Sequence, residues 1–207
     1  TELSEDLLAR FRPVPLLDEY DAYEQLMSYW QETMHDDVFL IMNEGWEAAA
    51  MPRKTLEDRD RKLSETPDLV VGTGRSAAKY KMDLIPPALI IDRYLADEKA
   101  KADDLARAVE EATRELEGFL EEHAVEDGLL APAMDDDKIN RTLVVARLKA
   151  AKAAHAEREE VDALITAMNL YDVEAMAKKA AKDSQSVLDT TALKAYHHLQ
   201  ASDVQDL

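Results

Sequence analysis

Residues 88–123 decide the fold, and they read ALIIDRYLADEKAKADDLARAVEEATRELEGFLEEH. Apolar or small side chains recur along this stretch at intervals of three and four residues. A spacing that averages 3.5 residues is typical of a helix that packs against a second helix along its length. Only Glu98 departs from the pattern. The positions are Ala88, Ile91, Leu95, Ala102, Leu105, Val109, Ala112, Leu116 and Phe119.

A loop follows at residues 124–137, AVEDGLLAPAMDDD, because Gly128 and Pro132 interrupt helical spacing there. The three aspartates that end the loop favour the N-terminus of a second helix, predicted over 138–168. The first arm is predicted over about 87–123, where Pro87 can occupy the first turn.

The two arms are expected to fold back on each other as a long antiparallel hairpin. This register places Phe119 near Leu143 and Leu116 near Val145. Charge favours the same pairing, because the glutamate-rich end of the first arm would face a basic half of the second. The bases of that half are Arg141, Arg147, Lys149 and Lys152.

The residues before the hairpin, 1–82, are predicted to form a small aromatic-rich subdomain with a basic linker. Both tryptophans lie before residue 52, so a compact small core is expected there. Asp18 is a candidate cap for a helix that ends near Met34. The run Val38–Met42 is too short to separate strand from helix, and we favour a strand.

The chain is thus predicted to be mostly α, with three parts at 1–82, 83–170 and 171–207. The first includes a short β element, and the last contributes one or two further helices. A composition of 46% apolar and 33% charged residues is typical of a folded protein. The chain is interpreted as a fragment, since both ends look cut.

The totals exclude several classes of function. The formal charge of −19 would repel a phosphate backbone from the surface as a whole. The absence of cysteine excludes disulfides, zinc-thiolate sites and a cysteine nucleophile. No stretch is long and apolar enough for a membrane helix and the N-terminus is charged, so we expect a cytoplasmic protein without membrane contact.

The sequence Asp68–Gly74, DLVVGTG, superficially matches a glycine loop that holds S-adenosylmethionine. Such a loop needs a preceding strand, a following helix and further strand–helix units. A basic stretch follows instead, so a turn between short strands is the favoured interpretation. No two histidines stand at the spacing of a helical metal site with a carboxylate. No catalytic, cofactor-binding or metal-binding residue is therefore predicted in this chain.

Two sets of residues are candidates for binding. The first is a group of bases that could contact a DNA backbone if a partner brought them close, although a solvated surface also explains them. The second is an apolar set near the C-terminus that could bind a protein partner or pack within the chain. The bases are Arg53, Lys54, Arg75, Lys79 and Lys81, and the apolar residues are Leu188, Leu193, Tyr196 and Leu199.

Four stretches carry a family resemblance: Tyr20–Asp37, Lys81–Tyr94, Glu126–Leu130 and Ala195–Gln200. With the long helix between the second and third, they resemble the C-terminal part of the modification subunit of type I restriction-modification systems. The resemblance spans essentially the whole chain.

The resemblance implies that the parent protein is a DNA methyltransferase that uses S-adenosylmethionine to methylate the N6 amino group of adenine. Two such subunits join one specificity subunit, a restriction subunit is added for cleavage, and DNA is bound through the complex. The family's catalytic motif is Asn-Pro-Pro-aromatic, whereas Ile85–Ala88 reads IPPA, so no catalytic residue is carried over.

What remains for the fragment is assembly. The resemblance implies contact with the specificity subunit through the hairpin or through residues 187–207. A free-standing coiled-coil adaptor is the alternative that the sequence leaves open.

Overall fold

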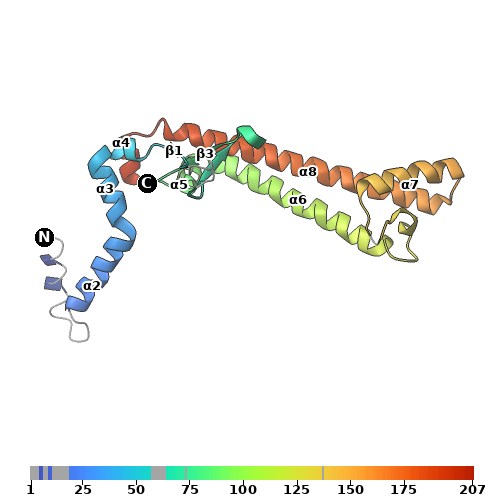
Figure 1. Ribbon diagram of the computed structural model, residues 1–207, viewed down its shortest axis with the longest axis horizontal. Helices are drawn as coiled ribbons and strands as arrows, with labels where there is room; N and C mark the ends of the chain where they lie inside the picture. The colour runs from blue at the N-terminus through green and yellow to red at the C-terminus, as the bar shows by residue number, and fades with distance from the viewer. Residues whose placement is uncertain (1–4, 7–8, 11–18, 57–63, 73, 137) are drawn as a thin grey trace. The chain divides into compact units, whose positions relative to one another are not determined.

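The computed structural model describes residues 5–6, 9–10, 19–56, 64–72, 74–136 and 138–207 (Figure 1). The chain forms two compact units. One comprises Thr1–Ile91 with Ala192–Leu207, and the other comprises Asp92–Thr191. The predicted fold class is confirmed, since the protein is mostly helical with a small three-stranded sheet. The two units divide the chain differently from the three parts expected.

From Glu19 onward, the first unit contains a nearly continuous helical run. It consists of α2 (Glu19–Tyr29), a π-helical turn η1 (Trp30–Met34), α3 (His35–Glu44) and the short α4 (Trp46–Ala49). The strand expected at Val38–Met42 is wrong, because these residues lie inside α3. Asp36 and Asp37 in the first turn favour a helix by their charge, and Gly45, at φ 82°, ends it. The expected cap Asp18 lies outside the described residues.

The described residues before residue 49 do not form the compact aromatic core that was expected. None of the described side chains between residues 20 and 48 is buried. The first buried residues are Ala49 and Ala50. The aromatic side chains of residues 20–48 are therefore exposed or half-buried.

A small antiparallel sheet follows, with strand order β1-β3-β2. Its register pairs Lys54 with Tyr80 and Leu69 with Tyr80, so these three side chains share one face of the sheet. A 3-10 turn, η2, lies between the second and third strands. The elements are β1 (Arg53–Lys54), β2 (Leu69–Val71), η2 (Gly74–Ser76) and β3 (Ala78–Lys81).

The core of the first unit joins the sheet to residues from both ends of its sequence. Tyr196 and Ile90 are fully buried at its centre. Ile90 comes from α5 (Pro87–Tyr94), and Val204 comes from α9 (Ala201–Asp206). The remaining buried members are Ala50, Leu69, Met82, Ile85 and Leu199.

The second unit contains the long antiparallel pair formed by α6 (Ala96–His123) and α8 (Arg158–Tyr196), whose last turn belongs to the first unit (Figure 1). The helix expected over 138–168 is instead two helices, α7 (Arg141–Ala154) and the start of α8. Between them His155 adopts the left-handed conformation, φ 53° and ψ 44°, and the chain reverses there. The hairpin is confirmed, but its second arm is α8.

Side-chain contacts define the register of the second unit. Thr113 of α6 donates a hydrogen bond to Glu174 of α8 over 3.1 Å. Two of the four bases expected to face the first arm, Arg141 and Arg147, instead pair with α8. Arg141 contacts Asp172, and Arg147 contacts Glu160, each over 2.7 Å.

The core of this unit is built where α7 folds back onto α8. Val144 and Leu148 of α7 pack with Leu164 and Ala167 of α8. Asn140 caps α7 by accepting a hydrogen bond from the Leu143 amide, so the cap is not the triple aspartate expected. Partly buried Phe119 and Leu120 pack against this core from the end of α6.

Candidate partner-binding site

A groove of about 400 Å³ runs between α6 and α8. Small side chains at Ala180 and Ser184 leave space that a larger residue would fill. Leu105 is consequently only half-buried, while Leu188 is buried at the floor. The lining residues are Glu98, Lys101, Leu105, Ala180, Asp183, Ser184, Val187 and Leu188.

The apolar surface of the groove continues along α8. Val187 is 60% exposed, and Met176 is 65% exposed. Val173, Met176, Ala180 and Val187 recur at the three- and four-residue spacing of one helix face. Two helices therefore leave part of an apolar face uncovered, which is the geometry that a third helix completes in a bundle.

The groove is bordered by charges of both signs. Glu98 and Lys101 come from α6, and Asp183 comes from α8. A groove with both signs of charge at its edge favours partners whose charged residues are arranged to match it, and the partner's net charge matters less. Further along α8, Lys178 and Thr113 both donate hydrogen bonds to Glu174, and these hold the pKa of Glu174 below its ordinary value.

The apolar residues predicted to bind a partner are mostly interior. Tyr196 is fully buried, Leu199 is buried, and Leu193 packs against the same core of the first unit. These three side chains pack within the chain, which is the alternative that the sequence left open. Only Leu188 borders the groove.

Sequence reasoning missed the groove residue Val187 and the exposed Met176, which lies further along α8. Their signal was the three- and four-residue spacing through Val173–Thr191. That spacing becomes visible only when α8 is treated as one continuous helix.

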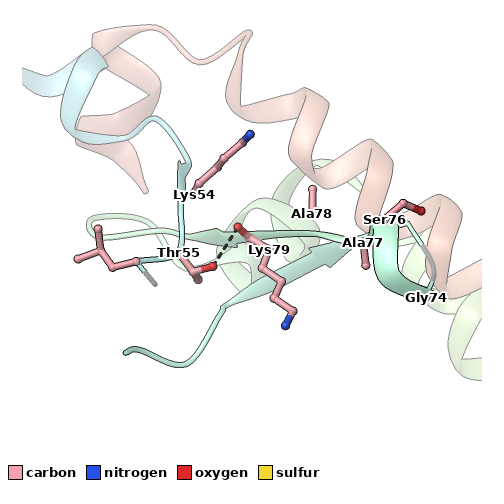
Figure 2. A pocket seen from close by; sticks show the side chains of 8 residues that line it. Lys54, Thr55, Gly74, Ser76, Ala77, Ala78 and Lys79 are labelled. Carbon is pink, nitrogen blue, oxygen red and sulfur yellow. Dashed lines mark hydrogen bonds between the residues drawn. The ribbon is translucent and has the colours of Figure 1, made fainter. Parts of the chain in front are cut away.

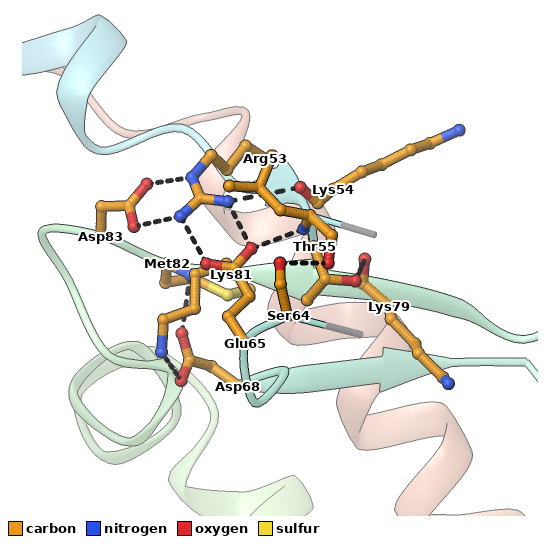
Figure 3. Close-up of polar contacts among 11 residues, drawn as sticks. Arg53, Lys54, Thr55, Ser64, Glu65, Asp68, Lys79, Lys81, Met82 and Asp83 are labelled. Atoms are coloured by element: carbon orange, nitrogen blue, oxygen red, sulfur yellow. Dashed lines mark hydrogen bonds and ion pairs between the residues drawn. The ribbon is translucent and has the colours of Figure 1, made fainter. Parts of the chain in front are cut away.

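Two of the five predicted DNA-contacting bases, Arg53 and Lys81, are engaged in ion pairs (Figure 3). Arg53 donates two hydrogen bonds to Glu65, at 2.6 and 2.9 Å, and two to Asp83. Contact with Arg53 lowers the pKa of Glu65 to about 2. Lys81 pairs with Asp68 over 2.7 Å, and the other oxygen of Asp68 accepts the Met82 amide.

The two remaining described bases do not form a common patch. Lys54 and Lys79 border the same shallow hollow, but their ammonium groups point away from each other (Figure 2). The register explains this. Lys54 pairs with Tyr80, so both side chains lie on one face of the sheet. Lys79 precedes Tyr80 in β3, so its side chain points to the opposite face. The side chain of Arg75 lies outside the described part of the chain. The described bases thus form no continuous basic surface.

The glycine sequence at Asp68–Gly74 contains β2 and leads toward the antiparallel strand β3. Leu69–Val71 form β2, Gly72 has φ 97°, and β3 follows after η2. Residue 73 lies outside the described part. An S-adenosylmethionine loop of the kind considered requires a parallel sheet and a following helix, and these strands supply neither.

Within the described residues, no group of three or more His, Asp or Glu side chains is arranged to hold a metal ion. No helix in that part of the chain is long and apolar enough to cross a membrane. Comparison with known proteins adds no family: no family model, curated protein or solved structure matches this chain.

Proposed function

We propose that this chain is the C-terminal assembly region of a type I modification subunit, and that the groove between α6 and α8 binds a helix of the specificity subunit. The proposal rests on the four stretches that resemble the family and on the open helical face of the second unit. The parent protein would be an adenine-N6 DNA methyltransferase of the cytoplasm.

The groove is the observation that carries the proposal. Val173, Met176 and Val187 are exposed on α8 beside a hollow that Ala180 and Ser184 leave open. Full burial of such side chains stabilises a complex by about 1.5–3 kcal/mol each before the costs of association are subtracted. A partner helix that inserts an apolar ridge here would complete a helical bundle.

The chemistry of methylation would lie elsewhere in the parent protein. S-adenosylmethionine, a second modification subunit, the restriction subunit and DNA would meet this region through the assembled complex. The occupied guanidinium of Arg53 favours protein assembly over direct DNA contact for this region.

The test is calorimetric titration of the full chain with its cognate specificity subunit, without DNA. We expect a Kd below about 1 µM. Val187→Glu places a charge in the groove and should weaken binding at least about ten-fold. Val145→Glu is the matched control, because Val145 is an exposed valine of α7 away from the groove.

Two results would contradict the proposal. The first is the absence of binding by the unaltered chain, which would move the subunit contact to another part of the parent protein. The second is an equal loss of affinity in Val145→Glu and Val187→Glu, because the effect would then be independent of the groove.

A further inference from the structure

A second surface of the protein lies in the other unit, on residues 19–47, which we call the acidic aromatic segment. It comprises α2, η1, α3 and the start of α4. Phe39 is 58% exposed and Met42 is 79% exposed. Tyr20, Met27, Tyr29, Met34 and Trp46 are further exposed large apolar residues of the segment.

The acidic aromatic segment exposes seven large apolar side chains. Isolated exposed apolar residues are common, whereas large groups on one element mark interaction sites. Here no described side chain of the segment is buried, although both tryptophans of the protein belong to it. The π-helical turn at Trp30–Met34 adds a feature that is frequent at functional sites.

The charge of the segment identifies the chemistry of its partner. It contains eight acidic residues and no lysine or arginine. Nucleic acid and anionic lipid carry the same sign of charge, and a second copy of this segment would bring acid against acid. These three occupants are disfavoured by electrostatic repulsion. The acids are Glu19, Asp21, Glu24, Glu32, Asp36, Asp37, Glu44 and Glu47.

We propose that the acidic aromatic segment binds a protein surface on which apolar side chains are flanked by lysine and arginine. Aromatic and methionine side chains such as Phe39 and Met42 would supply most of the buried contact, since such residues dominate interface energetics. The carboxylates would orient the partner and speed its association. The proposal is independent of the groove, because it uses other residues in the other unit.

The two tryptophans give a local readout, because Trp30 and Trp46 both lie in the segment. The full chain is titrated with three amphipathic helical peptides of about 20 residues. All three carry the same leucine face, and the opposite face is lysine, glutamine or glutamate. We expect the lysine peptide to shift tryptophan emission to shorter wavelength and to bind at least about ten-fold tighter than the glutamine peptide. The glutamate peptide should cause no shift.

Matched double variants locate the binding. Phe39→Ser with Met42→Ser should weaken the lysine peptide at least about ten-fold. Val173→Ser with Met176→Ser removes exposed apolar groups from α8 and should leave affinity within about two-fold. Circular dichroism checks that both variants keep their helix content. The proposal is overturned if tryptophan emission does not move, if the lysine and glutamine peptides bind equally, or if both double variants weaken binding alike.

Discussion

The hydroxyl of Tyr196 donates a hydrogen bond to the carbonyl oxygen of Ile85 over 2.7 Å, across 111 residues of sequence. Both residues are buried in the core of the first unit. The bond closes that unit by joining the last turn of α8 to the chain that leads into α5. Burial raises the pKa of the Tyr196 phenol, so the group stays protonated and remains a donor.

Tyr196→Phe should destabilise the protein by about 1–2 kcal/mol, because the buried carbonyl of Ile85 loses its partner. Tyr196→Ala should cost about 3–5 kcal/mol, since it also leaves a cavity. Urea unfolding followed by circular dichroism measures both changes. Tyr94→Phe is the control, because Tyr94 is 43% exposed, and it should stay within about 0.5 kcal/mol. Equal stability of Tyr196→Phe and Tyr94→Phe would show that the bond contributes nothing.

The ion pairs of Arg53 predict a pH dependence. The pKa of Glu65 in the folded protein is about 2, below its ordinary 4.5. The stabilisation of the folded protein by ionised Glu65 is therefore fully present above pH 4.5 and is lost as pH falls toward 2. Melting temperature recorded between about pH 6 and pH 2 should fall less steeply in Glu65→Gln than in the unaltered protein.

Arg53→Ala tests the same pair from its other end. It should also reduce the dependence on pH in the acid range, because Glu65 then loses the donor that lowers its pKa. The interpretation fails if the unaltered protein and both variants lose stability in parallel as pH falls.

The first arm of the hairpin could be predicted because its apolar spacing is regular. The expected helix over 87–123 is present as α5 and α6, which are separated at Leu95 by a residue outside helical geometry, φ −129° and ψ 34°. The second arm could not be placed, because the chain reverses at His155 without a glycine or proline. A left-handed backbone conformation is uncommon at a histidine, and the local sequence pattern does not predict it.

The candidate groove depended on that missed reversal. If 138–168 were the second arm, Ala180 and Val187 would lie outside the hairpin. No groove beside a neighbouring helix would then be expected at these residues. Val38–Met42 shows a second limit, since a short apolar run does not distinguish strand from helix. The aromatic segment 1–52 was expected to be compact because it is rich in large side chains, but composition does not state whether a core is completed within one chain.

Two of the stretches quoted for the resemblance, Lys81–Tyr94 and Glu126–Leu130, contain residues that make close contacts with distant parts of the chain or with a helix end. Ile85 accepts the Tyr196 bond, and Asp83 holds Arg53. In Glu126–Leu130, Gly128 lies where an added Cβ would be 2.1 Å from the His123 carbonyl oxygen. That oxygen also accepts the Leu130 amide, so the turn closes onto the end of α6.

Gly128→Ala should therefore be strongly destabilising, by about 2 kcal/mol or more, because backbone atoms must move to admit the methyl group. Gly118→Ala is the matched control. Gly118 lies within α6 and an added Cβ meets nothing within 4 Å, so this change should stabilise the helix by about 0.5–1 kcal/mol. Urea unfolding measures the free energy of unfolding of both variants, which should decrease for Gly128→Ala and increase for Gly118→Ala. A neutral Gly128→Ala would refute the close approach at His123.

The reversal between α7 and α8 yields a prediction that separates two folds of the same sequence. His155 is a non-glycine residue in left-handed conformation, and the amides of His155 and Ala156 both donate to the Ala151 carbonyl. This arrangement is the one that glycine favours at the end of a helix. His155→Gly should thus stabilise the protein by about 0.5–1 kcal/mol. In one continuous helix over 138–168, the same change would destabilise by about 1 kcal/mol.

Ala153→Gly is the control, because Ala153 lies inside α7 and a glycine there should destabilise the helix. The melting temperatures of the two variants decide between the folds. If His155→Gly raises the melting temperature and Ala153→Gly lowers it, the reversal at His155 is supported. If both changes lower it, a continuous helix is supported.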